Sequence, residues 1–134
     1  MRVLGIDYGR TKIGFALGDD ESRVATPLEV VHVADGQSPA DVVERMVAQE
    51  GPDVIVVGVP LEVGPFHSDD QLNEIRAFID DLAERVSIDV HEIDESHTSR
   101  EAQRLQQEEG ARADEDALAA MILLQAFFDE NRSI

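Results

Sequence analysis

The pattern of hydrophobic and polar positions changes from strand-like to helical along the chain. Short apolar segments rich in β-branched residues and bounded by turn residues dominate the first third, and two more occur further on. The run at 53–59 is apolar without alternation, which is typical of a strand buried on both faces. Strands are therefore predicted at 2–7, 11–18, 26–33, 53–59 and 88–93.

Capping residues and helical spacing predict helices after the third strand. Ser38 is a suitable N-cap, Pro39 suits the first helical position, and Gly51 suits the end of that helix. The last helix is apolar on almost every side between 117 and 128, so we expect it to be largely buried. Helices are expected at about 38–51, 68–86 and 98–110, and from about 114 onward.

This order of elements predicts an α/β fold. Three successive strands joined by tight turns form an antiparallel meander. Each later strand is reached through a helix, so it should lie parallel to the first strand by a right-handed crossover. The expected architecture is one mixed five-stranded sheet, three strands antiparallel and two parallel, with helices on both faces. Functional sites in such sheets form at the carboxyl ends of the parallel strands.

Composition limits the class of protein. The 134 residues suit a single domain spanning 1–134, and the absence of cysteine excludes disulfides and thiolate metal sites. Met1 is followed at once by the first strand and no apolar run approaches 18 residues, so we expect a cytoplasmic protein without a membrane span. The net charge of -18 has two explanations, a surface adapted to a saline cytoplasm or a face that binds a basic partner.

Three acidic residues stand out by position. Asp7 ends the first strand, Glu95 follows the fifth strand, and Asp116 lies in the first turn of the last helix. If the first and fifth strands flank the fourth, all three carboxylates should meet at one edge of the sheet. Grouped carboxylates repel each other, so they require a cation, and such hard oxygen ligands favour Mg²⁺ or Mn²⁺. Asp20 or Asp94 is a candidate for a fourth ligand.

The segment "GIDYGRTKIGFA" at 5–16 predicts a site for phosphate beside these acids. Gly9 removes side-chain bulk where a phosphate backbone would approach, and Gly14 is a second position of this kind. Arg10 and Lys12 supply positive charge in an otherwise acidic chain. A bound pair of metal ions next to them would suit cleavage of a phosphodiester. These residues therefore suit metal-dependent cleavage of a phosphodiester bond.

Four segments together resemble the YqgF (RuvX) family. They are "GIDYGRTKIGFA", "IVVGVPLE", "DESHTS" and "DEDALAAMILLQAFFD", in this order and across nearly the whole chain. The resemblance implies a ribonuclease H-like fold. It also implies an enzyme described as a Holliday junction resolvase and as a nuclease that matures the 5′ end of precursor 16S rRNA. By similarity, Asp7, Glu95 and Asp116 match the three acidic residues of the family.

The chain departs from the family pattern at two places, and other functions stay open. Ser96 and His97 stand where the family usually has an arginine and an apolar residue, and Glu62 replaces an asparagine. These changes favour, as an alternative, a catalytically impaired protein-binding module of the same fold. A phosphate-loop domain related to actin-like ATPases is a further alternative. The sequence does not choose between RNA and DNA, or between a monomer and the homodimer that two paired cuts in a junction would require.

Overall fold

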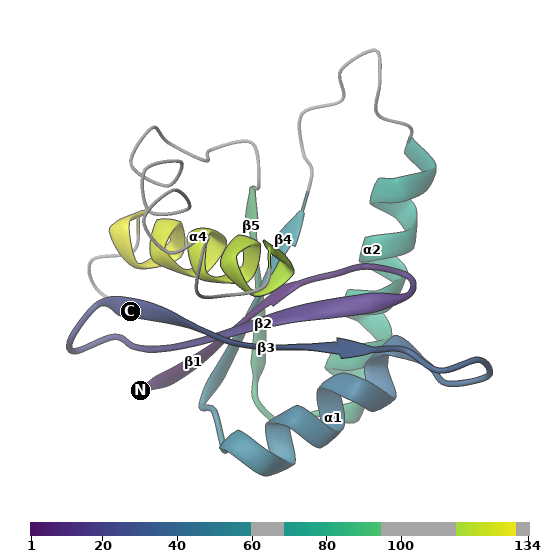
Figure 1. Ribbon diagram of the computed structural model, residues 1–134, viewed down its shortest axis with the longest axis horizontal. Coiled ribbons are helices and arrows are strands. Elements are labelled where there is room, and N and C mark those ends of the chain that lie inside the picture. The colour runs from purple at the N-terminus through teal and green to yellow at the C-terminus, as the bar shows by residue number, and fades with distance from the viewer. Residues whose placement is uncertain (60–68, 95–114, 131–134) are drawn as a thin grey trace.

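The computed structural model describes residues 1–59, 69–94 and 115–130. Five strands form one sheet in the order β3-β2-β1-β4-β5 (Figure 1). The strands are β1 (Arg2–Asp7), β2 (Lys12–Asp19), β3 (Val24–His32), β4 (Val54–Val59) and β5 (Asp89–Asp94). The helices are α1 (Pro39–Glu50), α2 (Asp69–Arg85) and α4 (Glu115–Glu130).

The sheet has the predicted mixture of directions. β1 pairs antiparallel with β2 and parallel with β4, and β4 pairs parallel with β5. β4 is buried along its whole length, as its continuous apolar run predicted. The α/β fold with five strands is therefore confirmed, and the strand ends lie within two residues of the predicted positions.

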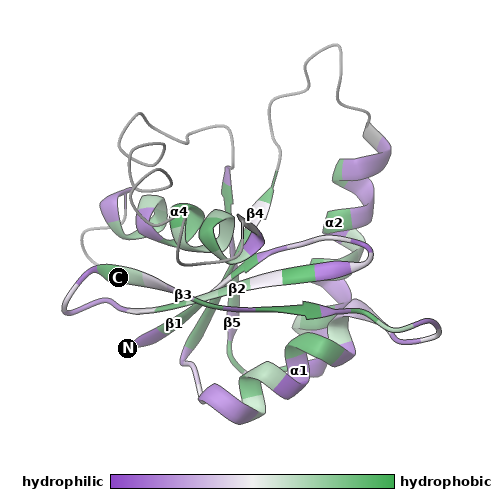
Figure 2. Cartoon of the chain, viewed as in Figure 1, coloured by the Kyte–Doolittle hydropathy of each residue, from purple (hydrophilic) through white to green (hydrophobic). Residues whose placement is uncertain are grey.

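Helices cover both faces of the sheet. Figure 1 shows α4 on one side and α1 and α2 on the other, and the buried side chains form one cluster in each layer. α4 is hydrophobic along its central turns (Figure 2), and Leu118, Leu124 and Phe128 are almost completely buried. The prediction that the last helix is largely buried is confirmed. Within the described part of the chain, no helix is long and apolar enough to cross a membrane.

Local sequence explains how α1 begins and ends. The Ser38 hydroxyl accepts a hydrogen bond from the Ala40 backbone, and Asp41 accepts one from the Ser38 backbone, which completes a capping box. Gly51 ends the helix in the left-handed conformation, with φ of 62°. The first residue of the predicted helix at 68–86 and the whole predicted helix at 98–110 lie outside the described residues.

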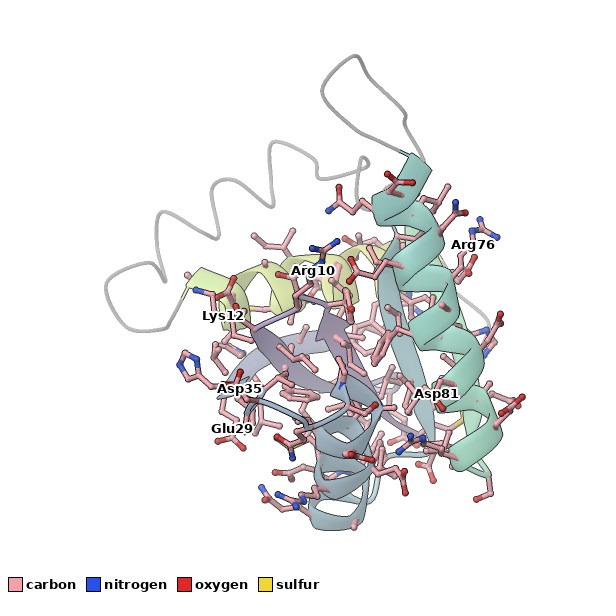
Figure 3. The ribbon with its side chains drawn as sticks, turned by 90° about the vertical axis from the view of Figure 1, so that its right-hand side faces the viewer. Arg10, Lys12, Glu29, Asp35, Arg76 and Asp81 are labelled. Atoms are coloured by element: carbon pink, nitrogen blue, oxygen red, sulfur yellow. The ribbon has the colours of Figure 1, made fainter. Side chains whose placement is uncertain are left out.

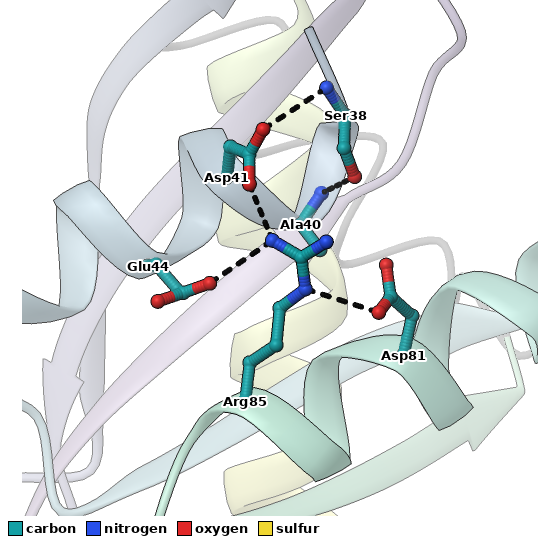
Figure 4. A network of polar contacts seen from close by, with 6 residues as sticks. All are labelled: Ser38, Ala40, Asp41, Glu44, Asp81 and Arg85. Atoms are coloured by element: carbon teal, nitrogen blue, oxygen red, sulfur yellow. Dashed lines mark hydrogen bonds and ion pairs between the residues drawn. The ribbon is translucent and has the colours of Figure 1, made fainter.

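Arg85 connects α1 and α2, the two helices that cover the same face of the sheet. Arg85 of α2 forms ion pairs with Asp41 and Glu44 of α1 and with Asp81 one turn earlier in its own helix (Figure 4). The distances are 3.1 Å to Glu44 and 3.0 Å to Asp81. Hydrogen bonding to Arg85 lowers the pKa of Asp41, and its bond from the Ser38 backbone acts in the same direction.

Candidate active site

Asp7 is the last residue of β1, at the carboxyl edge of the parallel strands. Side chains alternate between the faces of a strand, so Asp7 shares a face with Val3 and Gly5. Val3 belongs to the α4 cluster, and a Cβ at Gly5 would lie 2.9 Å from Cβ of Leu124. The carboxylate of Asp7 is therefore on the side of the sheet that α4 covers.

The start of α4 lies against the strand next to Asp7. Gly14 of β2 is the direct partner of Asp7 across the antiparallel pair. A Cβ built on Gly14 would lie 2.5 Å from the carbonyl carbon of Asp116 and 3.1 Å from the nitrogen of Ala117. Directly opposite residues have Cβ positions about 4.5–5.5 Å apart, so Asp7 lies beside the backbone of Asp116. The fold thus brings two of the three predicted acids together on one face.

Lys12 forms an ion pair with Asp116. Nζ of Lys12 lies 2.7 Å from Oδ2 of Asp116, an oxygen that is itself buried. Lys12 precedes Gly14 by two positions on β2, so both face α4. Figure 3 shows Lys12 at the first turn of α4. The ammonium group therefore provides a positive charge next to the two acids.

Arg10 has a different partner from Lys12. Its Nε donates to both carboxylate oxygens of Glu74 on α2, at 2.8 and 3.0 Å. This hydrogen bonding raises the pKa of Arg10, which stays positively charged. The Arg10 side chain is 76% exposed, and Figure 3 shows it between Lys12 and α2. The two basic residues of the predicted phosphate loop therefore pair with opposite layers of the fold.

A pocket lies on the α2 side of this loop. Its volume is about 540 Å³. The ring of Tyr8 packs against that of Phe78 in a tilted arrangement, with 4.7 Å between ring centroids. Burial raises the pKa of Tyr8, and the nearby Glu74 carboxylate adds to that shift. The pocket is lined by Tyr8, Gly9, Arg10, Asp70, Gln71 and Glu74.

The two glycines have structural reasons that the sequence did not reveal. A Cβ at Gly9 would overlap the carbonyl oxygen of Lys12 inside the β1–β2 turn, so the turn itself requires glycine. A Cβ at Gly14 would meet the backbone of Asp116, so glycine at this position allows α4 to pack directly on β2. A phosphate contact at Gly9 stays a prediction. Gly14, Ala16 and Gly18 lie on one face of β2, and Gly5 of β1 lies opposite Ala16. This even spacing of small residues is a sequence signal for close approach of a helix.

The candidates for a fourth ligand lie away from Asp7. Asp20 pairs with the N-terminal ammonium group at 2.6 Å, at the opposite end of β1, so its place in the site was a wrong prediction. β1 has six residues and spans about 17 Å. Asp94 ends β5 opposite Val59, which packs in the α1 and α2 layer, so Asp94 faces that layer.

The third predicted acid, Glu95, lies outside the described residues, as do Glu62, Ser96 and His97. Within residues 1–59, 69–94 and 115–130, no group of three acidic or histidine side chains is arranged to hold a metal ion. The described residues fit Mg²⁺ or Mn²⁺ in two respects. Asp7 and Asp116 offer hard carboxylate oxygens on one face of the sheet. The ammonium group of Lys12 beside Asp116 shows that a cation is accommodated at this position. Binding of a metal ion by the three carboxylates of Asp7, Glu95 and Asp116 stays a prediction.

Solved structures with a similar arrangement of strands and helices identify the fold. Thermus thermophilus RuvC, solved in complex with a Holliday junction substrate, has a TM-score of 0.65 at 18% identity and covers 98% of this chain and 95% of its own. The fowlpox virus resolvase, solved with Holliday junction DNA, has a TM-score of 0.62 at 14% identity over 99% and 100%. These likenesses show a ribonuclease H-like fold.

Sequence comparison then identifies the family. Residues 1–130 match RuvX, described as Holliday junction resolvase, and the chain belongs to this family. A relative from Francisella philomiragia subsp. philomiragia, named "Putative pre-16S rRNA nuclease", is 32% identical over 133 residues, covering 96% of this chain and 97% of its own. A relative of the same name from Chloroflexus aggregans is 32% identical over 136 residues, covering 98% and 95%. Membership makes the chain a nuclease, a hydrolase of phosphodiester bonds.

Proposed function

We propose that this chain is a metal-dependent endonuclease whose active site contains Asp7, Asp116 and Glu95. The observation that carries the proposal is the position of Asp116 against Gly14, the strand partner of Asp7. Two acids that are 109 positions apart in the sequence thereby share one face at the carboxyl edge of β1. Glu95 directly follows β5 in the sequence, and β5 ends at this same edge, next to β4.

The proposed metal is Mg²⁺ or Mn²⁺, held by the carboxylates of Asp7, Asp116 and Glu95. When bound, such an ion supplies a polarised water and stabilises the leaving oxygen of a phosphodiester. The chain itself supplies the negative charge that holds the ion. Lys12, Arg10 and the backbone at Gly9 are proposed to contact the phosphates on either side of the cut. The Lys12 side chain is 49% exposed, and the Arg10 side chain is 76% exposed.

Two substrates are supported. The family description favours a Holliday junction, and the names of the relatives favour precursor 16S rRNA, which would be cut at its 5′ end in the cytoplasm. The two substrates make different demands on the protein. A junction needs two paired cuts and therefore a homodimer, whereas one cut in rRNA needs only a monomer.

The proposal is tested by Mn²⁺-dependent cleavage of a four-way DNA junction and of precursor rRNA, measured side by side. Asp7→Asn and Asp116→Asn remove metal-binding charge at nearly constant volume, so each should reduce kcat by more than about 100-fold. Asp20→Asn is the matched control, because the same change is made at the opposite edge of the sheet. We expect it to retain cleavage.

The outcomes separate the alternatives. Wild-type rates in Asp7→Asn would contradict the proposed site. Absence of cleavage of both substrates by the folded wild-type protein would favour the catalytically impaired protein-binding module of the same fold. Cleavage of only one substrate identifies it, and the oligomeric state of the active species then follows from size-exclusion chromatography with light scattering.

A further inference from the structure

Lys12 has a position that no other basic residue of its loop shares. Its ammonium group lies 2.7 Å from Oδ2 of Asp116, on the face of the sheet that also carries Asp7. Arg10, two positions earlier, pairs instead with Glu74 of α2. The loop therefore directs one cation to the acids and the other cation away from them.

Adjacent carboxylates need a compensating charge whether or not a metal ion is present. Two like charges on neighbouring elements raise the free energy of the folded state unless a cation is close. Among the described residues, the ammonium of Lys12 supplies such a charge to Asp116. Its side chain is 49% exposed, whereas that of Asp116 is only 25% exposed. Lys12 can thus turn into solvent while Asp116 stays in place, held by the packing of its backbone on Gly14.

The type of residue is also informative. Lys12 is the only lysine in the chain, and the other ten basic residues that carry a full charge are arginines. Arginine offers a carboxylate a rigid, planar group of five N–H donors, and Arg10 holds both carboxylate oxygens of Glu74 through its Nε. Lysine carries a compact charge on a flexible stem and leaves its partner more easily. A cation that must be exchanged is better supplied by lysine than by arginine.

We propose that Lys12 is a displaceable counter-ion for the metal site. In the metal-free protein its ammonium neutralises Asp116. A divalent cation takes its place, and the released ammonium then contacts a phosphate of the nucleic acid. Metal binding and phosphate binding would therefore strengthen each other, as coupled equilibria require. This inference rests on the proposed metal site.

The first test is a calorimetric titration with Mn²⁺ in the absence of nucleic acid. Lys12→Met removes the competing charge and keeps the aliphatic stem. The variant has no Lys12–Asp116 ion pair to break when Mn²⁺ binds, and no ammonium to repel the bound ion. The Kd for Mn²⁺ should therefore fall roughly tenfold. Arg10→Met is the matched control, with the same change of charge in the same loop but no contact with Asp116. Its Kd should stay within about twofold of wild type.

The second test follows binding of a labelled four-way junction with Ca²⁺ in place of Mn²⁺. Ca²⁺ should tighten binding by wild type several-fold more than binding by Lys12→Met. An equal gain in both proteins would overturn the coupling. An unchanged or weaker Mn²⁺ affinity in Lys12→Met, with wild type still binding Mn²⁺, would overturn the counter-ion role alone. Wild type that binds no Mn²⁺ would overturn this inference together with the proposed metal site.

Discussion

Gly14→Ala should reduce activity by moving Asp116, although Gly14 itself makes no proposed contact with substrate. The added Cβ would lie 2.5 Å from the carbonyl carbon of Asp116, and an ordinary contact needs at least 3.4 Å. The obstructing atoms belong to the backbone of α4 and cannot rotate away. The first turn of the helix must therefore move by about 1 Å. A misplacement of about 1 Å at a reacting group can lower the rate about 100-fold.

The same substitution also overpacks the interface between α4 and β2. Overpacking of a buried contact costs about 1–3 kcal/mol. For a chain of this size, each kcal/mol lowers the Tm by roughly 4 °C. Cleavage is therefore assayed well below the Tm of the variant, where the protein stays folded. Under that condition a loss of kcat measures the position of Asp116, and the melting curve measures the packing cost separately.

Gly18→Ala is the control for Gly14→Ala. Its Cβ would lie 2.6 Å from the ring of Phe128, at the other end of α4, so the helix is overpacked again. Asp116 lies twelve residues before Phe128, or about 18 Å along the helix. We expect a comparable fall in Tm with nearly unchanged kcat. Equal losses of kcat in the two variants would show that activity merely follows stability, and wild-type activity in Gly14→Ala would refute the argument.

Three further predictions concern stability. Gly51→Ala should cost about 1 kcal/mol in a urea unfolding experiment, because φ is 62° there and no atom lies within 4 Å of the new Cβ to add contacts. Arg85 lowers the pKa of Asp41 below its usual 3.8. The charged Asp41 carboxylate therefore stabilises the fold at pH values above about 3.8, and this stabilisation is lost as the pH falls through the pKa of the folded state. Asp41→Asn should accordingly be less stable than wild type at neutral pH, and the difference should shrink below about pH 3.8 in unfolding curves. The net charge of -18 predicts that Tm rises with KCl, since the Debye length falls from about 30 Å at 0.01 M to about 3 Å at 1 M. A flat or falling Tm would instead favour a basic protein partner as the reason for the acidity.

Local patterns in the sequence determined which elements form and how they are ordered. Ser38 and Pro39 begin α1 and Gly51 ends it, because caps and backbone conformation depend on neighbouring residues. The unbroken apolar run of β4 required burial on both faces, and this placed the strand inside the sheet. The same reasoning predicted that Asp7 lies at the carboxyl edge of the sheet, where sites of such folds form.

Only the tertiary structure decided which side chains meet at that edge. The ion pair of Lys12 with Asp116 and the pairing of Arg10 with Glu74 depend on the β1–β2 register and on the packing of two distant helices. No local pattern contains that information, since a shift of one residue in register moves every side chain of a strand to the other face. Asp20 shows the consequence. It directly follows β2, the strand that pairs with β1, and the antiparallel direction of β2 places it at the end of β1 opposite to Asp7. The chemistry of Asp7 and Asp116 follows from their residue type. Their proximity follows from Gly14, which has no Cβ and therefore lets the first turn of α4 pack directly on β2.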